Sequence, residues 1–195
     1  MYLSKWVLDK QCLLKNRIIN DYVLHQKIFN LFPDTKDRCF LYSSKLSRGP
    51  MVTVLVQSET KPEKPLFGEY ESKQIEDSFF EHKRYLFQCK FCPVKQISHS
   101  KKTIPIKNEE EVFKWLKSRE ENFGVLFHEE TLLKNEDGSM IMRQKDNPSR
   151  IHIDYVEVTG VLDVKDVTLF NRTIKNGIGR SKGFGLGMLQ LRPIE

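Results

Sequence analysis

The chain has 195 residues, with 32 lysines and arginines against 26 aspartates and glutamates, and a net charge of +6. A hydrophobic fraction of 39%, including 13 phenylalanines, is enough to fill a folded core and excludes intrinsic disorder. The sequence contains no apolar run of about 18 residues and no apolar signal-peptide core at its N-terminus. We therefore expect a cytoplasmic protein with no membrane partner.

The first half of the chain is predicted to alternate strands with one clear helix. Asn20 is a good N-cap, and Pro33 ends the helix that follows it. Two prolines between Lys61 and Pro65 indicate a loop, because proline interrupts both helix and sheet. The predicted elements are strands at 2–9, 40–42 and 51–57, a helix at 20–31, and a weaker strand at 70–79.

The second half repeats this outline. Its first strand is followed by a lysine-rich loop and by a helix whose acidic start suits the helix dipole. The predicted elements are strands at 85–97, 125–133, 139–143, 151–164 and 186–191, with helices at 109–121 and 166–175. A glycine-rich loop precedes the last strand.

The order of elements predicts an α+β protein. Each half approximates β-α-β-β-α-β, although the second helix of the first half is hard to locate. This order is typical of two tandem ferredoxin-like domains. We place the N-terminal domain at residues 1–82 and the C-terminal domain at residues 83–195.

The four cysteines do not form a convincing metal or disulfide pattern. Cys12 and Cys39 stand alone, and cytosolic thiols remain reduced. Cys89 and Cys92 have metal-like spacing, but residues three apart on a strand point to opposite faces. We favour small side chains on a strand, with no metal or cofactor; a small zinc-dependent nucleic-acid-binding module is the alternative.

Glycine is concentrated near the C-terminus, where five of the chain's ten glycines fall within eleven residues. A Rossmann loop would follow a strand and open a helix, whereas this loop follows a helix and enters a strand. A flexible loop rich in N–H groups and cations suits a phosphodiester backbone. An ordinary connection with solvated charges is the alternative. The glycines are Gly177, Gly179, Gly183, Gly185 and Gly187.

Basic residues gather in three stretches, which together favour a nucleic-acid-binding face in the C-terminal half. Two of these stretches, 94–108 and 171–193, contain no acidic residue. The candidate contacts are Lys95, Lys101 and Lys102 in the first stretch, Arg143, Lys145 and Arg150 in the second, and Arg172, Arg180 and Lys182 in the third.

The candidate catalytic group lies on the first helix. Tyr22 and His25 are three residues apart, so their side chains share one helical face. Helix geometry alone fits His25 better as a half-buried core residue than as a catalyst. Its chemistry favours catalysis, because an imidazole titrating near neutral pH can move the proton of a ribose 2′-OH.

These features together resemble the CasE-type endoribonucleases, which process CRISPR repeat RNA in type I-E systems and belong to the RAMP superfamily. The resemblance covers the whole chain in order. It rests on Met1-Tyr-Leu-Ser-Lys5, on Tyr22-Val-Leu-His25-Gln followed by Asn30-Leu-Phe-Pro33, on Cys92-Pro-Val-Lys95, on Trp115-Leu116 and on the glycine-rich loop. The loop is shared by RAMP proteins generally, so the Tyr-x-x-His-Gln helix is the specific part. Cys89 and Cys92 are outside the family pattern, and Gly183 replaces a common serine or alanine.

The resemblance implies two RRM-like domains and metal-independent cleavage of a repeat hairpin in precursor RNA. The 2′-OH would attack the adjacent phosphorus and leave a 2′,3′-cyclic phosphate. His25 would be the general base or acid, Tyr22 would position the reacting groups, and Lys27 or Lys182 would offset the phosphorane charge. The implied partners are the repeat hairpin, the mature guide RNA and the other subunits of a type I-E surveillance complex.

The charge distribution and the position of His25 predict where cleavage takes place. Because the basic excess lies in the C-terminal half and His25 in the other, we expect the cleavage site where the two domains meet. The rival hypothesis is a non-catalytic RAMP subunit that binds guide RNA and carries His25 as a core residue.

Overall fold

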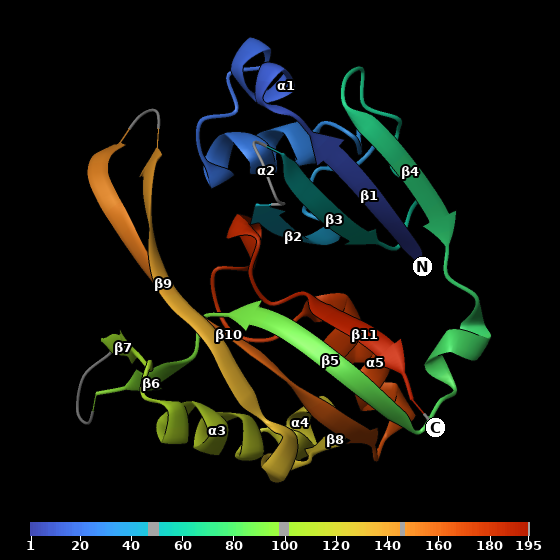
Figure 1. Ribbon diagram of the computed structural model, residues 1–195, viewed down its shortest axis with the longest axis vertical. Coiled ribbons are helices and arrows are strands. Elements are labelled where there is room, and N and C mark those ends of the chain that lie inside the picture. The colour runs from blue at the N-terminus through green and yellow to red at the C-terminus, as the bar shows by residue number, and fades with distance from the viewer. Residues whose placement is uncertain (47–50, 98–101, 145–146, 195) are drawn as a thin grey trace.

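The computed structural model describes residues 1–46, 51–97, 102–144 and 147–194, and for residues 46, 141–144 and 147–151 the description is restricted to the backbone. Two antiparallel sheets dominate the molecule, one above the other in Figure 1. None of the described helices is long and apolar enough to cross a bilayer.

The upper sheet is built from the first 74 residues. Its strands are β1 (Tyr2–Leu8), β2 (Phe40–Leu46), β3 (Val52–Ser58) and β4 (Glu69–Gln74), in the spatial order β2-β3-β1-β4. All neighbouring strands are antiparallel, which is the ferredoxin-like order. Helices α1 (Lys10–Lys15) and α2 (Asp21–Phe29) follow β1.

Strand alternation determines what each face of the upper sheet contacts. Trp6 of β1, Tyr42 of β2 and Val54 of β3 point to one face, where they form a core with Leu24 and Ile28 of α2. The expected helix at 20–31 and the first three strands are therefore confirmed. A short helix after β1, α1, was not expected.

The second helix of this ferredoxin-like unit is replaced by irregular chain. Residues 59–68 connect β3 to β4 without a helix, and this stretch contains Pro62 and Pro65. Proline lacks the amide that a helix interior needs, so a crossover that is normally helical becomes a loop. The predicted strand at 70–79 ends at Gln74, and η1 (Asp77–Phe80) leads to the lower sheet.

The lower sheet repeats the same order with a longer hairpin. Its strands β5 (Arg84–Phe91), β8 (Val125–Phe127), β10 (Asn147–Val164) and β11 (Leu189–Pro193) lie in the order β11-β5-β10-β8, and β9 (Leu133–Gln144) pairs with β10. Helices α3 (Glu109–Lys117), α4 (Glu120–Phe123) and α5 (Val167–Asn176) complete this second ferredoxin-like unit.

The predicted strand at 85–97 is wrong in one respect, because it breaks after Phe91. Pro93 follows the break, and β6 (Val94–Gln96) pairs separately with β7 (Thr103–Pro105). The expected loop at 98–108 therefore contains a strand. Tyr85, Phe87 and Phe91 alternate on β5 and pack against Trp115 and other residues of the helices.

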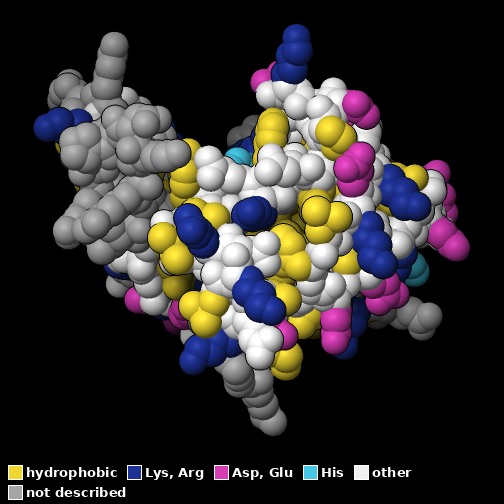
Figure 2. Space-filling model, turned by 90° about the horizontal axis from the view of Figure 1, so that it is seen from above, with side chains coloured by type: hydrophobic (Ala, Val, Ile, Leu, Met, Phe, Trp, Pro, Cys, Tyr) yellow, Lys and Arg dark blue, Asp and Glu magenta, His cyan; other side chains and the backbone are white. Residues whose placement is uncertain are grey.

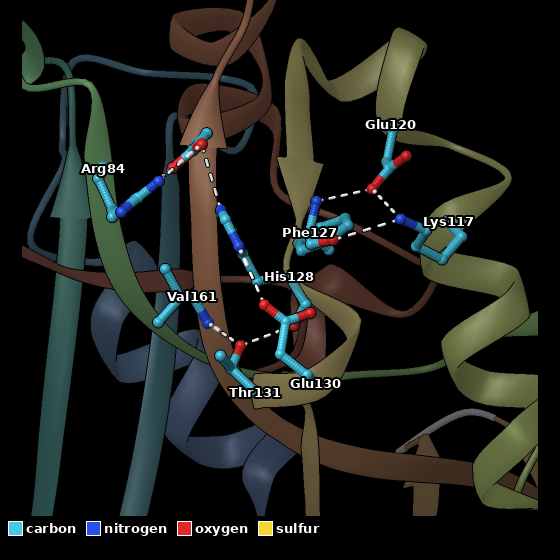
Figure 3. Close-up of polar contacts among 9 residues, drawn as sticks. Arg84, Lys117, Glu120, Phe127, His128, Glu130, Thr131 and Val161 are labelled. Carbon is cyan, nitrogen blue, oxygen red and sulfur yellow. Dashed lines mark hydrogen bonds and ion pairs between the residues drawn. The ribbon is translucent and has the colours of Figure 1, made fainter.

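The predicted strand at 125–133 is also interrupted, by η2 (Glu129–Thr131), as Figure 3 shows. Thr131 Oγ1 donates to the carbonyl of His128 at 2.7 Å and accepts from the amide of Val161 at 2.9 Å. Glu120 accepts the amide of Phe127 at 2.6 Å. These contacts supply hydrogen-bond partners for backbone amides and a carbonyl at the point where β10 changes its pairing partner from β8 to β9.

His128 is part of this structural junction. Its Nδ1 lies 3.3 Å from Glu130 and its Nε2 lies 3.2 Å from Asp163. The Arg84 guanidinium, 2.6 Å from Asp163, lowers the pKa of that carboxyl to about 2. A histidine held between two carboxylates at a strand junction has a structural role here.

Candidate active site

His25 lies on α2 at the junction of the two units, against the glycine-rich loop. The side chain of Asn20 accepts the amide of Val23 at 2.9 Å, which fixes the start of the helix. Leu24 and Ile28 anchor α2 to the upper sheet, and this leaves Tyr22 and His25 on a neighbouring face. A groove beside α2 is lined by Tyr22, His25, Gln26, Lys27, Phe29 and Asn30.

Aromatic rings hold the His25 imidazole. Its ring centroid lies 5.5 Å from that of Phe40, 6.2 Å from that of Tyr42 and 6.4 Å from that of Phe29. Nδ1 is shielded from solvent and has no hydrogen-bond partner among the described residues. Packing, and not a carboxylate, therefore orients this histidine within the described part of the chain.

This environment makes the neutral imidazole the favoured form. Burial lowers the pKa of His25 below its usual value of 6.5, and the positive charge of Arg38 lowers it further. Both effects penalise the imidazolium. At neutral pH His25 is therefore ready to accept a proton.

Tyr22 of α2 packs against the lower unit. Its ring packs against a small core that contains Cys92, Ile153 and Leu186 of the lower unit. Its hydroxyl accepts a hydrogen bond from Gln26 Nε2 at 3.2 Å. The tyrosine is thus fixed beside His25 with its phenol in the same groove.

Tyr42 connects α2 to the glycine-rich loop. The side chain is fully buried, and its hydroxyl donates to the carbonyl of Asp21 at 3.2 Å and lies 3.5 Å from that of Gly183. Burial raises the pKa of this phenol far above its usual range, so it remains protonated and acts as a donor. Sequence reasoning did not select Tyr42, although its alternation with Phe40 on β2 places both rings under α2.

The glycine-rich loop closes on itself and brings η3 (Lys182–Phe184) to His25. Four of its five glycines have φ between +70° and +84°. A Cβ on Gly187 would lie 2.4 Å from the carbonyl of Ile178, so the turn has no room for a side chain. Gly183 differs, because a Cβ there would meet only His25 and Arg38, at 3.9 Å and 4.0 Å.

Two cations stand beside this loop. Burial lowers the pKa of Lys182, the charge of Arg38 lowers it further, and Lys182 Nζ donates to the carbonyl of Gly177 at 3.3 Å. Arg38 reaches the site from the segment between α2 and β2, and burial lowers its pKa while leaving it charged. Sequence reasoning named Lys182 and missed Arg38, whose position depends on tertiary packing.

The other residues predicted to contact RNA are spread over the lower unit. Lys95 pairs with Glu111 of α3 at 2.8 Å, and Arg180 donates to Thr103 at 3.1 Å. Lys102 lies beside β7 and Arg172 on α5. Lys101 and Lys145 lie outside the described residues, and Arg143 and Arg150 are described as backbone positions paired across the β9–β10 hairpin.

The charge is unevenly placed over the surface. On the face in Figure 2, most acidic side chains lie on the right, where basic side chains accompany them, and further basic side chains lie over the middle among hydrophobic ones.

Cys89 and Cys92 are both buried, in different clusters. Cys89 lies in the core of the lower unit and Cys92 in the small core at the junction. Burial raises the pKa of both thiols, which keeps them protonated. Among the described residues, no group of three or more His, Cys, Asp or Glu side chains is placed to hold a metal ion.

Comparison with known proteins gives consistent matches over the full length. The family model described as "CRISPR associated protein" matches residues 1–193. The CRISPR-associated endoribonuclease Cse3 of Thermus thermophilus is 26% identical over 218 residues, which cover 99% of this chain and 100% of Cse3.

Solved structures share the fold. Cse3 bound to a 19-nucleotide RNA matches with a TM-score of 0.87 at 23% identity, over 99% of this chain and 100% of Cse3. Cas6e from Escherichia coli K-12 matches with a TM-score of 0.69 at 24% identity, over 100% of both chains. The expected pair of ferredoxin-like units is thereby confirmed.

Proposed function

The chain belongs to the CRISPR-associated protein family, and on that premise we propose that it is a metal-independent endoribonuclease that cuts CRISPR repeat RNA. Its relative from Thermus thermophilus carries the name endoribonuclease. The observation that carries the proposal is the half-buried, uncharged His25, which shares a groove with Tyr22 and faces the glycine-rich loop.

The reaction is a transesterification in which His25 is the general base. His25 removes the proton of the ribose 2′-OH, and the 2′-oxygen attacks the adjacent phosphorus. The bond from phosphorus to the 5′-oxygen breaks, and that oxygen takes up a proton. The products are a 2′,3′-cyclic phosphate and a 5′-OH. A positioned base of this kind supplies a rate factor of about 10²–10⁴.

Charge at the reacting phosphate is offset by cations of the junction. Arg38 is near enough to lower the pKa of His25, and Lys182 immediately precedes Gly183 on the loop facing the imidazole. A fixed cation stabilises the doubly charged phosphorane more than the singly charged phosphodiester. We assign this role to Arg38 and Lys182, and place Lys27 at the rim of the groove with Tyr22.

The remaining expectations stay part of this proposal. Residues 1–82 and 83–195 are two domains, and the hairpin of the repeat lies on basic residues of the second. A double-stranded RNA stem is recognised mainly by shape and phosphate contacts. The enzyme retains the guide RNA that it produces and joins a type I-E surveillance complex in the cytoplasm.

A single substitution in the RNA tests this mechanism. Replacing the 2′-OH at the cut nucleotide with hydrogen removes the nucleophile, so cleavage should stop while binding remains. The unmodified RNA, cut by the same preparation, should end in a 2′,3′-cyclic phosphate. Cleavage of the 2′-deoxy RNA, or a linear 3′-OH end, would contradict the proposal.

A further inference from the structure

A second cationic cavity lies next to the His25 site, between the segment before β2 and helix α5. Its volume is about 710 Å³, within the roughly 300–1,000 Å³ range of ligand-binding sites. Arg38, Arg172, Lys175 and Lys182 line it, and Glu59 is the acidic residue among the described lining. The cavity is therefore strongly positive.

The sequence of α5 explains how this wall is formed. Phe170 and Ile174 bury one side of the helix in the lower core. Asn171, Arg172 and Lys175 fall on another side, which faces the cavity. The polar face of α5 thus borders the upper unit, and Arg172 and Lys175 on it are exposed.

Two residues make the cavity continuous with the cleavage site. Arg38 and Lys182 line the cavity, and Arg38 also acts electrostatically on His25. Lys182 is adjacent to Gly183, which faces the imidazole. A chain of phosphates passing His25 would therefore meet Arg38 and Lys182 next, and then Arg172.

The position of the cavity indicates which part of an RNA it would hold. In Figure 1 the β9–β10 hairpin projects to the left of α2, whereas α5 lies to the right. With the RNA stem on the β9–β10 side, the cavity leaves the opposite side of α2 for the strand beyond the cut. Glu59 forms an ion pair with Lys175 of the cavity, at 2.7 Å.

We propose that this cavity binds the phosphate backbone of single-stranded RNA on the 3′ side of the scissile bond. The inference rests on the proposed function and adds a second contact region to it. The downstream strand is held until the bond to its 5′-oxygen has broken. Its phosphates contact Arg172 and displace Glu59 from Lys175.

The test compares two hairpin RNAs that carry a 2′-deoxy nucleotide at the cut. One ends just beyond the cut, and the other continues as a single strand. Binding of each is measured across a series of salt concentrations, because each phosphate contact on single-stranded nucleic acid adds about 0.7 to the slope of log affinity against log salt. We expect tighter binding and a steeper slope for the longer RNA.

Opposite effects are expected from two variants. Arg172→Gln should remove about 0.7 of the additional slope if it contacts one phosphate. Glu59→Gln should strengthen binding of the longer RNA, because it releases Lys175, and misfolding cannot produce such a gain. Both effects are measured as the difference in binding between the longer and the short RNA, so a contact of Arg172 with the hairpin itself cancels. Lys73→Gln, an exposed position on β4, is the matched charge control.

The outcomes separate this inference from the proposed function. Equal binding of both RNAs, or a gain from the longer RNA that survives Arg172→Gln and is unchanged by Glu59→Gln, would overturn it. A gain that comes from a 5′ extension instead would also overturn it. Cleavage of an all-ribose repeat in the same preparation reports on the proposed function independently.

Discussion

At the residue scale, the chemistry of the site depends on what surrounds one imidazole. Phe29, Phe40 and Tyr42 fix the ring of His25 by contact, while Arg38 opposes its protonation. The histidine is therefore both a packed residue and an available base. The sequence left core position and catalyst open for His25: the aromatic contacts show a packed ring, and the catalytic role stays a proposal.

Arg38 should control the pH dependence of cleavage. A general base works when neutral, so kcat/KM should rise with pH through the free-enzyme pKa of His25, which lies below 6.5. Arg38→Gln removes a positive charge, so this pKa should increase and the rising limb should move to higher pH. The measurement is a pH profile of kcat/KM for both proteins.

Exposed Lys36, two residues before Arg38, provides the control, and Lys36→Gln should leave the profile in place. A rising limb that stays fixed in Arg38→Gln, or moves to lower pH, would show that Arg38 does not act on the catalytic base.

At the scale of elements, the glycine-rich loop acts as a rigid support for the site. Gly187 donates its amide to the carbonyl of Lys90 at 2.7 Å, and its carbonyl accepts from Ile178 at 2.9 Å. Gly185 lies against the ring of Tyr42, where an added Cβ would be 3.0 Å from Cε2. The glycines mainly allow the loop to close and to approach Tyr42, while Gly183 faces His25.

This difference between glycines can be measured. Gly187→Ala forces a Cβ against Ile178 at φ +84° and should destabilise the protein by about 1–3 kcal/mol. Cleavage should fall about tenfold to 100-fold as η3 shifts. Gly183→Ala has space and an ordinary φ, so its stability should remain within about 0.5 kcal/mol of the wild type. Urea denaturation and single-turnover cleavage provide the two readouts.

The test is whether Gly187→Ala lowers stability and cleavage more than Gly183→Ala does. If Gly183→Ala were as damaging as Gly187→Ala, backbone closure would not be the function of Gly187.

Sequence patterns predicted the elements better than their junctions. Asn20 marks the start of α2, and the spacing of Tyr22 and His25 places both side chains on one face, because these signals are local. Pro93 is a local signal for the break after Phe91, whereas the interruption by η2 depends on which strands are available for pairing, which no local pattern contains. Arg38 could not be found for the same reason, since its place beside His25 arises only when β2 and α2 pack together.

At the scale of the whole molecule, the site requires the two ferredoxin-like units to be held in one arrangement. Gln57 of β3 donates to the carbonyl of Ile174 on α5 at 2.7 Å, and this bond is buried. The contact satisfies a carbonyl near the end of α5 with a side chain from the other unit. It joins the upper sheet to the helix that lines the cationic cavity.

Removing this link should weaken the molecule at the junction. Gln57→Leu leaves the Ile174 carbonyl without this partner, so unfolding free energy should fall by about 1–3 kcal/mol. The exposed Gln74 of β4 is the control, because Gln74→Leu removes no such bond and should change stability by less than about 0.5 kcal/mol. Chemical denaturation followed by tryptophan fluorescence measures both. If Gln57→Leu and Gln74→Leu had the same unfolding free energy, the stability of the junction would not depend on the Gln57 hydrogen bond.

The most direct test of the proposed function is single-turnover cleavage of repeat RNA in EDTA by the wild type and by His25→Ala. Both proteins are checked for folding by circular dichroism, for contaminating nuclease and for binding of the 2′-deoxy RNA. We predict that the wild type keeps its rate in EDTA, and that His25→Ala binds normally but cleaves about 10²–10⁴-fold more slowly. Unchanged cleavage by His25→Ala would contradict the catalytic role of His25, and loss of wild-type cleavage in EDTA would contradict metal independence.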